Sequence, residues 1–477
     1  MQLAMSNLCD TISRKNANRI FIAILTIATL VYADISFVNH YLFKTYSLDL
    51  GAYTKCLYDF MHGVVNDSLV YRSEPVNCFA SHFDLYLVLF APLVYVFGTY
   101  TLLVIQIISV LVGAWGICKL IGLYTGNRII PLFAAATFLS FFGVYHAFTF
   151  DYHSNVVATM LIPWLFYFFK ERRYICSTLF LLLIIIAKEN LSLFMAFVCL
   201  GLVWDYKEDK KALYILLMYA VVSLLYFFLI NIVVMQYFAN AESQRGFVRY
   251  NQWGNSYSEI ILYFLRNPLE IISVLFGNPK KVEFFICLLF SGGIALLLKP
   301  NYLIMTIPLI AQKMLANYYV FWTPYLHYNV EFAPIVVVAS FILITSIKKS
   351  FVSQILAGLL LVSTLGTLIY MNRYSKTWHN YAKCVVFDAS HYEQSKCDVH
   401  DVYSYMKLIP DEASVCASDI FVPHLCLRKD IYTYHDKKIY DTEYMLLLEP
   451  EEEIKALTST YMVVKQSNNI WLLKRKI

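Results

Sequence analysis

The chain carries little charge for its length. Of its 477 residues, 15% are Asp, Glu, Lys or Arg, whereas about 25% is usual in soluble domains. Hydrophobic residues make up 59% of the sequence, and its mean hydropathy is +0.57. Long apolar runs recur along the sequence, and this pattern favours a polytopic membrane protein over an unusually apolar soluble one.

Several motifs of soluble binding proteins are missing. The sequence has no GxGxxG motif and no phosphate-binding loop, and its 11 cysteines show no CxxC or Cys/His metal spacing. The net charge of +5 sits in short loops between apolar runs, which does not indicate nucleic-acid binding. No small-residue cleavage site follows the first apolar run, so we expect this run to stay as the first span.

Eleven stretches are candidate membrane spans, each approaching the roughly 20 apolar residues that a span needs. They cover 19–38, 100–122, 129–148, 155–170, 174–187, 190–204, 211–238, 282–298, 301–320, 330–347 and 351–371. A further apolar piece, 83–98, is too short and contains Pro92. We interpret it as a re-entrant or interfacial helix.

The distribution of basic residues predicts the orientation. With a cytoplasmic N-terminus and 83–98 not crossing, every inner loop is basic, as the positive-inside bias requires. These loops carry Arg128, 170–173, 205–211, Lys299 and 348–349. If 83–98 crossed the membrane, the loops at 170–173 and 348–349 would face outward. We therefore expect eleven spans and an extracytoplasmic C-terminus.

Ionisable residues gather at the predicted outer ends of the spans. Charge beside hydrocarbon is costly, so such residues are candidates for a functional site. Five groups meet this description: Asp49; His82 and Asp84; Asp151 and His153; Lys188 and Glu189; and His327. Arg245 and Arg249 add cations in a long outer loop, where they contact either lipid headgroups or a substrate.

Each group also has a simpler interpretation. Either Ser47 or Asp49 could cap the helix that follows, or Asp49 could be a catalytic carboxylate. Lys188 and Glu189 could form a local ion pair that reaches the interface, or Lys188 could face a phosphate group. His327 is either a residue of the interfacial aromatic belt or a substrate contact.

The paired spacings Asp151-x-His153 and His82-x-Asp84 suit solvated loops or a polar pocket. Such a pocket could hold pyrophosphate or a divalent cation such as Mg²⁺ or Mn²⁺, although hard cations prefer more oxygen ligands. Asp49, Asp151 and His153 are the candidate metal ligands.

The last hundred residues are polar and change in pattern. A predicted helix at 401–409 precedes strands near 413–419, 430–434, 443–449 and 459–475, which indicates a small α/β domain. We therefore divide the chain into a transmembrane domain, 1–371, and an extracytoplasmic domain, 372–477. The first outer loop, 44–99, carries interfacial helices, and a second amphipathic segment covers 249–265.

The motif order resembles a known group of proteins. LDLGAY, SHFDLYLVLFAPLVYVFG, FDYHSN, AKENLSL, LHYN and LIPDEASVCASDIFVPHLCLRKDIY follow one another as in a family of uncharacterised bacterial and archaeal predicted membrane proteins. That family is grouped with the GT-C glycosyltransferase superfamily. The resemblance implies an all-α GT-C-like transmembrane fold in a bacterial inner membrane.

In the superfamily, an Asp of the first outer loop acts as base or binds a metal, and Asp49 matches it. Asp151 matches an acidic residue of the second outer loop, while His153 is typical of the uncharacterised family alone.

The resemblance also implies a reaction. A sugar would pass with inversion from a polyprenyl-phosphate carrier to a glycan, lipid or protein acceptor at the outer face. Asp49 would take the acceptor proton, and Lys188 with Arg245 or Arg249 would stabilise the departing lipid phosphate. The alternatives are a transporter or flippase of a lipid-linked or anionic substrate, and a non-catalytic membrane scaffold. A transporter would place its polar residues near the bilayer midplane.

Overall fold

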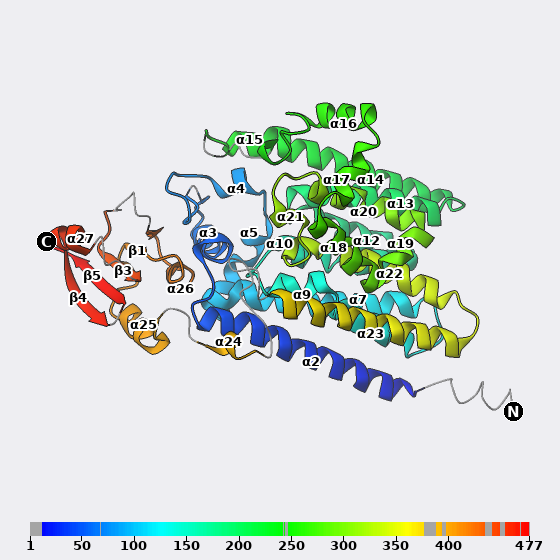
Figure 1. Ribbon diagram of the computed structural model, residues 1–477, viewed down its shortest axis with the longest axis horizontal. Coiled ribbons are helices and arrows are strands. Elements are labelled where there is room, and N and C mark those ends of the chain that lie inside the picture. Colours follow the sequence, from blue (N-terminus) through cyan, green and yellow to red (C-terminus); the bar gives the residue numbers. More distant parts are fainter. Residues whose placement is uncertain are drawn as a thin grey trace. The chain divides into compact units, whose positions relative to one another are not determined.

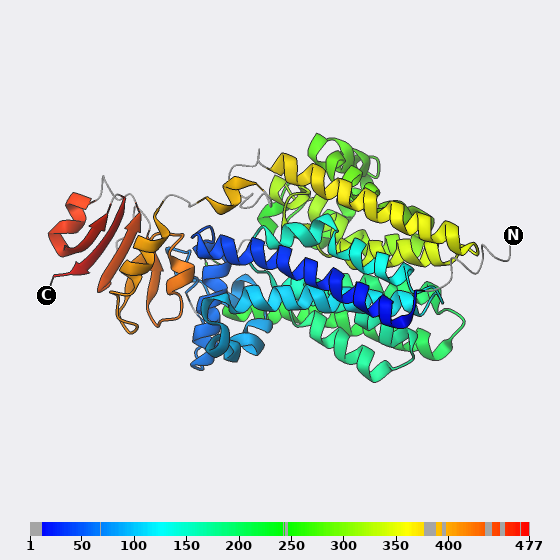
Figure 2. The ribbon, with the colours of Figure 1, turned by 90° about the horizontal axis from the view of Figure 1, so that it is seen from below.

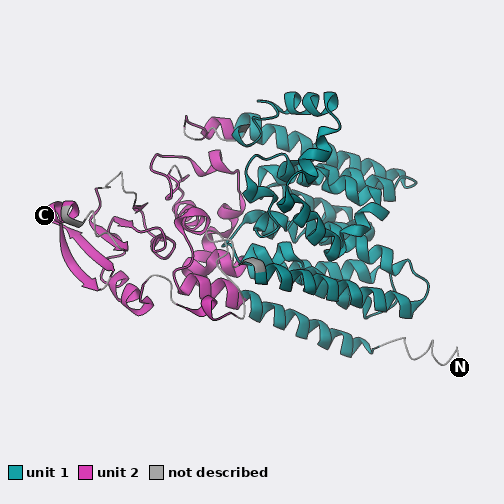
Figure 3. Ribbon diagram, in the orientation of Figure 1, with its two compact units in different colours: residues 1–32, 106–234, 245–382 teal, residues 33–105, 235–244, 383–477 magenta. Residues whose placement is uncertain are grey.

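The fold is mostly helical and ends in a small sheet (Figure 1). The computed structural model describes residues 12–66, 68–241, 243, 247–375, 388–393, 397–434, 441–448, 454–467 and 469–476. Contacts divide the chain into two compact units, coloured in Figure 3. We call 1–32, 106–234 and 245–382 the helical unit, and 33–105, 235–244 and 383–477 the mixed unit. The division of the chain at 371/372 stays a prediction.

Helices make up the secondary structure described for the helical unit. Helix α2 (Arg14–Tyr41) begins in it and continues into the mixed unit, and α7 (Thr101–Gly122) begins at the end of the mixed unit. The other elements of the helical unit are α8 (Ile130–Leu139), α9 (Phe142–Phe148), α10 (Ser154–Thr159), α11 (Ile162–Lys170), α12 (Tyr174–Ile185), α13 (Glu189–Asp205), α14 (Lys210–Leu229), η4 (Ile230–Val234), η5 (Phe247–Arg249), α16 (Tyr257–Arg266), α17 (Glu270–Phe276), α18 (Pro279–Leu288), η6 (Leu289–Gly293), α19 (Ile294–Leu298), α20 (Pro300–Met314), α21 (Tyr319–Trp322), η7 (His327–Asn329), α22 (Phe332–Thr345) and α23 (Ser350–Ser375).

Six helical stretches among the described residues are long and apolar enough to cross a membrane, or seven if α8 and α9 count as one bent span. The six are Arg14–Tyr41, Tyr86–Gly122, Lys210–Phe238, Pro279–Leu298, His327–Thr345 and Ser350–Arg373. Helices α8 and α9 meet at an angle of 44°. Several predicted spans correspond to shorter helices, such as α12 with 12 residues and α20 with 15. The polytopic architecture is therefore confirmed, but the count of eleven spans is not.

The segment at 83–98 is divided into short helical pieces. They are α5 (Tyr86–Phe90), η2 (Ala91–Leu93) and α6 (Val94–Phe97), with η3 (Gly98–Tyr100) leading into α7. Pro92 lies in the first turn of η2, and Gly98 has a φ of +54° that favours glycine. The same residues also belong to the apolar stretch Tyr86–Gly122, so the non-crossing placement stays a prediction.

The mixed unit combines the first long loop with the C-terminal segment. Its further elements are η1 (Ser47–Gly51), α3 (Ala52–Met61), α4 (Cys78–Ser81), α15 (Met235–Phe238), α24 (Ala389–Tyr392), α25 (Val399–Met406), β1 (Val415–Ala417), α26 (Val422–Leu425), β2 (Ile431–Thr433), β3 (Tyr444–Leu448), α27 (Ile454–Thr460), β4 (Tyr461–Ser467) and β5 (Ile470–Arg475).

The five strands form one sheet in the order β2-β1-β3-β5-β4, visible as the orange and red arrows of Figure 2. Strand β1 pairs in parallel with β2 and β3, whereas β5 is antiparallel to β3 and β4. Cys416, Met445 and Leu473 lie in its apolar core. The predicted α/β character of this segment is confirmed.

Candidate functional site

Polar side chains meet at one end of the helical unit, where helices end and the next ones begin. The connections are α9 to α10, α12 to α13, and the stretch from α20 through η7 to α22. We call this group the polar centre, and its members are joined by the contacts described below. It consists of Asp151, His153, Asn155, Lys188, Lys313, His327 and Glu331.

Gln106 of α7 holds the connection between α9 and α10. Its Nε2 donates to the backbone oxygen of Asp151 at 2.8 Å, and its Oε1 accepts from the backbone N–H of His153 at 3.0 Å. Asp151 has a φ of +46°, and positive φ is uncommon outside glycine but enriched in Asp and Asn. The buried Gln106 therefore fixes an unusual backbone path that sets the positions of Asp151 and His153.

His153 and His327 are brought together. Their rings stack with centroids 3.4 Å apart and planes inclined by 18°, and both residues are buried. Gly143 of α9 makes the approach of η7 possible, because a Cβ there would come within 2.3 Å of the backbone oxygen of Asn329. Two motifs that lie far apart in the sequence thus share one site.

Two buried charges belong to the centre but were not among the predicted site residues. Glu331, 5% exposed, accepts a hydrogen bond from Asn155 Nδ2 through its Oε1 at 2.6 Å. Lys313, 4% exposed, donates to the backbone oxygen of Tyr328 at 3.0 Å. A charged residue inside an apolar run is itself a signal of function, and this signal would have found both.

The predicted cations have different surroundings. Lys188 precedes α13 in an extended conformation and lies close enough to act electrostatically on Glu331. Among the described residues it forms no ion pair within 4 Å, so a local pair with Glu189 is not present. Arg249 is exposed and lies 4.5 Å from the centroid of the Phe321 ring. Arg245 falls outside the described residues.

Asp49 belongs to the mixed unit, at a strained turn. Its φ of +64° and ψ of −87° lie near the positive-φ γ-turn, a rare and strained conformation. Strained backbone of this kind clusters at functional sites. Gly51 before α3 is already helical, and Asp49 is the last non-helical residue before it. The Ala52 N–H donates to the Asp49 backbone oxygen, as at an N-cap position, so the capping interpretation of Asp49 stays a prediction. Asp49 itself is half-buried.

The C-terminal segment holds this turn from within the same unit. The backbone N–H of Ser47 donates to Asp419 Oδ1 at 2.8 Å, and the Ser47 hydroxyl donates to the same oxygen. At Gly51, a Cβ would meet Val422 Cγ1 at 3.4 Å and the Tyr46 backbone oxygen at 3.2 Å. The position of Asp49 therefore depends on residues near the other end of the chain.

His82 and Asp84 also belong to the mixed unit. His82 is half-buried and follows α4 in an extended conformation. Asp84 is buried, and its Oδ1 accepts from the backbone N–H of Tyr86 at 2.9 Å, at the start of α5. Asp84 therefore stabilises the backbone where the loop enters α5.

A metal centre finds no support in the geometry. Among the described residues, no group of three or more His, Cys, Asp or Glu side chains is placed to hold a metal ion. The suggestion that Asp49, Asp151 and His153 form such a set is therefore not carried further.

The mixed unit contains a histidine pair with a predictable pH response. His424 stacks on His40 at 3.9 Å between centroids, and burial lowers the pKa of His424 to about 3. The folded state thus favours the neutral ring, and its stability falls as the pH drops below the unfolded pKa of roughly 6.5. Between pH 7.5 and 5 we expect a loss of about 1–2 kcal/mol in the free energy of unfolding.

Denaturant titrations at several pH values measure this loss. His424→Phe keeps a ring for stacking and should lose less stability between pH 7.5 and 5 than the wild type does, because one buried histidine fewer must take up a proton. A variant as pH-sensitive as the wild type would assign the response to another group.

Comparisons with known proteins fit this architecture. The structure is similar to the crystal structure of ArnT from Cupriavidus metallidurans bound to undecaprenyl phosphate, with a TM-score of 0.53 and 10% sequence identity. The match covers 97% of this chain and 98% of the other. The chain therefore shares the overall fold of ArnT. Its long apolar helices and the description of its family make it an integral membrane protein.

The sequence also identifies the family. Residues 39–461 match the family described as Predicted membrane protein (DUF2079), and the chain belongs to it. The comparison with curated protein sequences gives no match.

Proposed function

We propose that this protein transfers a sugar from a polyprenyl-phosphate carrier to an acceptor at the extracytoplasmic face of the membrane. The observation that carries the proposal is the fold, which matches ArnT along almost the whole of both chains. In its crystal structure ArnT is bound to undecaprenyl phosphate.

Asp49 is the proposed base. Its carboxylate takes the proton of the acceptor hydroxyl while that oxygen attacks the anomeric carbon of the sugar. The bond from this carbon to the phosphate oxygen breaks, and the carrier leaves as a lipid phosphate, so the configuration inverts. The strained turn supports this role, because Asp49 is held at a fixed place between Ser47 and the buried Leu50.

Lys188 is the proposed contact for the departing phosphate. It lies at the connection between α12 and α13, it is half-buried, and it makes no ion pair within 4 Å in the described part of the chain. A compact ammonium group suits a phosphate, where negative charge develops as the bond to the sugar breaks. Arg249 is the second candidate cation.

The distribution of charge favours transfer over transport. Asp151, Lys188, Lys313 and Glu331 all lie at helix ends or in the connections between helices. A transporter of an anionic lipid would need polar groups on broken helices near the bilayer midplane.

Binding of the carrier tests the proposal directly. Purified protein in lipid nanodiscs should bind undecaprenyl phosphate, and Lys188→Met should weaken this affinity roughly tenfold, as expected for one charged hydrogen bond. Lys207→Met, an exposed lysine beyond the opposite end of α13, is the matched control and should bind as the wild type does.

The outcomes separate the claims. No binding by the wild-type protein would contradict the proposed function. Normal binding by Lys188→Met would contradict only the role of Lys188. Transfer of radiolabelled sugar from a polyprenyl-phospho-sugar in vesicles, compared with translocation of the intact lipid, distinguishes the transferase from a flippase.

A further inference from the structure

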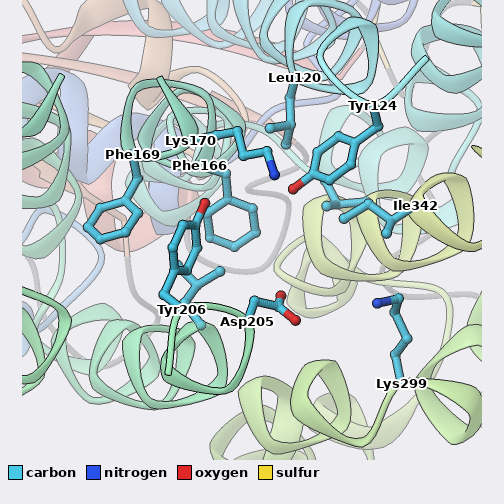
Figure 4. A pocket seen from close by; sticks show the side chains of 11 residues that line it. Leu120, Tyr124, Phe166, Phe169, Lys170, Asp205, Tyr206, Lys299 and Ile342 are labelled. Carbon is cyan, nitrogen blue, oxygen red and sulfur yellow. The ribbon is translucent and has the colours of Figure 1, made fainter. Parts of the chain in front are cut away.

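The helical unit has a second polar site, at a cavity of about 230 Å³ (Figure 4). Its polar lining comes from the ends of four helices: Tyr124 after α7, Lys170 of α11, Asp205 and Tyr206 at the end of α13, and Lys299 before α20. Its apolar lining is Leu120, Phe166, Phe169, Leu202, Val338 and Ile342. The charged ends of Lys170, Asp205 and Lys299 point into the same open space.

The two lysines leave the cavity with excess positive charge. In the described part of the chain, neither forms an ion pair within 4 Å. Lys170 Nζ lies 4.6 Å from the centroid of the Tyr124 ring, and Lys299 Nζ lies 5.7 Å from that of Tyr302. Asp205 is the one carboxylate that lines the cavity beside these two lysines, so the lining has a net charge of +1. Ring faces hold the ammonium groups in place but do not neutralise them.

This cavity is distinct from the polar centre. Lys188 precedes the first residue of α13, whereas Asp205 is the last of its 17 residues. At 1.5 Å per residue, the two ends of α13 are about 25 Å apart. The cavity therefore lies at the other end of α13 from Lys188, beside the basic loops 170–173 and 205–211 that the charge bias predicts to be cytoplasmic.

We propose that the cavity binds the phosphodiester headgroup of an anionic phospholipid. The ammonium groups of Lys170 and Lys299 contact the phosphate oxygens, and the Tyr124 hydroxyl donates to the same group. Phe166, Leu120 and Ile342 provide an apolar wall for the first part of the acyl chains. Free phosphate would leave this wall in contact with water, so a lipid is the better occupant. Anionic lipids are also the ones that attract basic residues at the cytoplasmic leaflet.

Native mass spectrometry of the purified protein tests this site. The wild type, offered equal amounts of phosphatidylglycerol and phosphatidylcholine, should retain phosphatidylglycerol. Lys170→Met with Lys299→Met should retain it roughly tenfold less or worse, since each lysine near an anionic surface contributes about 1 kcal/mol. The matched control changes the exposed Lys207 and Lys210 to Met, removes the same charge from an adjacent loop, and should leave retention unchanged.

Three results would overturn the proposal. One is equal retention of phosphatidylglycerol by the wild type and the Lys170/Lys299 variant. Another is equal loss in the Lys207/Lys210 control. The third is displacement of the lipid by an equal concentration of inorganic phosphate, which would identify free phosphate as the ligand. A variant with arginine at positions 170 and 299 keeps both positive charges and should retain phosphatidylglycerol. If only the Met variant loses the lipid, the loss is due to the missing charge and not to misfolding. This test does not depend on sugar transfer.

Discussion

Replacing Asp49 with Asn should abolish sugar transfer while the protein still folds and inserts into the membrane. Asn removes the carboxylate that accepts the acceptor proton, and loss of a general base lowers the rate by roughly 10²–10⁴-fold. It is also the substitution that best tolerates a φ of +64°, since Asn and Asp enter positive φ more readily than other side chains do. Turnover of radiolabelled polyprenyl-phospho-sugar in vesicles measures the loss.

A matched variant shows whether the effect belongs to Asp49. Glu74 is an exposed carboxylate of the same loop, and Glu74→Gln should transfer sugar at the wild-type rate. Undecaprenyl phosphate should bind to Asp49→Asn with unchanged affinity, because the base acts on the acceptor. Near-normal transfer by Asp49→Asn would remove the assigned role.

Replacing Glu331 with Gln should destabilise the helical unit by about 1–3 kcal/mol. Gln keeps the volume and an oxygen for the Asn155 amide, which donates to Glu331 at 2.6 Å. It removes the negative charge that acts on the buried Lys313, and an uncompensated buried charge is costly. Unfolding in mixed detergent micelles, followed as denaturant increases, measures the change in free energy.

A double-mutant cycle isolates the interaction. Lys313→Met with Glu331→Gln removes both charges, and it should be less destabilised than the sum of the two single variants by about 1 kcal/mol. Strict additivity would mean that the two charges do not act on each other. The cycle measures only the free energy of unfolding, so its result does not depend on whether the protein is a transferase.

Much of the helical architecture could be predicted because burial in lipid leaves a strong pattern. Apolar runs coincide with most helices from α7 to α23, and Lys188 lies between two of them as predicted. Helices α16 and α17 fall between the predicted spans 211–238 and 282–298. Lengths were less predictable, since proline and tight connections divide runs that look continuous. Pro163 starts α11 inside the predicted span 155–170. The predicted span 129–148 is divided at Ser140, where α8 ends.

Other features depend on contacts between distant parts of the chain. Strand β1 pairs in parallel with β2 and β3, and no local pattern indicates which strands become neighbours. At the polar centre, the stacking of His153 on His327 joins two motifs 174 residues apart, as their numbers show. Lys313 and Glu331 lie inside the predicted spans 301–320 and 330–347, so the polar connections between apolar runs do not indicate them.

The bond between Ser47 and Asp419 spans 372 residues of sequence. During synthesis, the ribosome completes the turn at Asp49 long before it reaches the segment that fixes this turn. The turn at Asp49 therefore lacks its contact with Asp419 until the C-terminal segment has been made. We therefore expect a chain that ends before Asp419 to hold Asp49 less firmly than the full-length protein does.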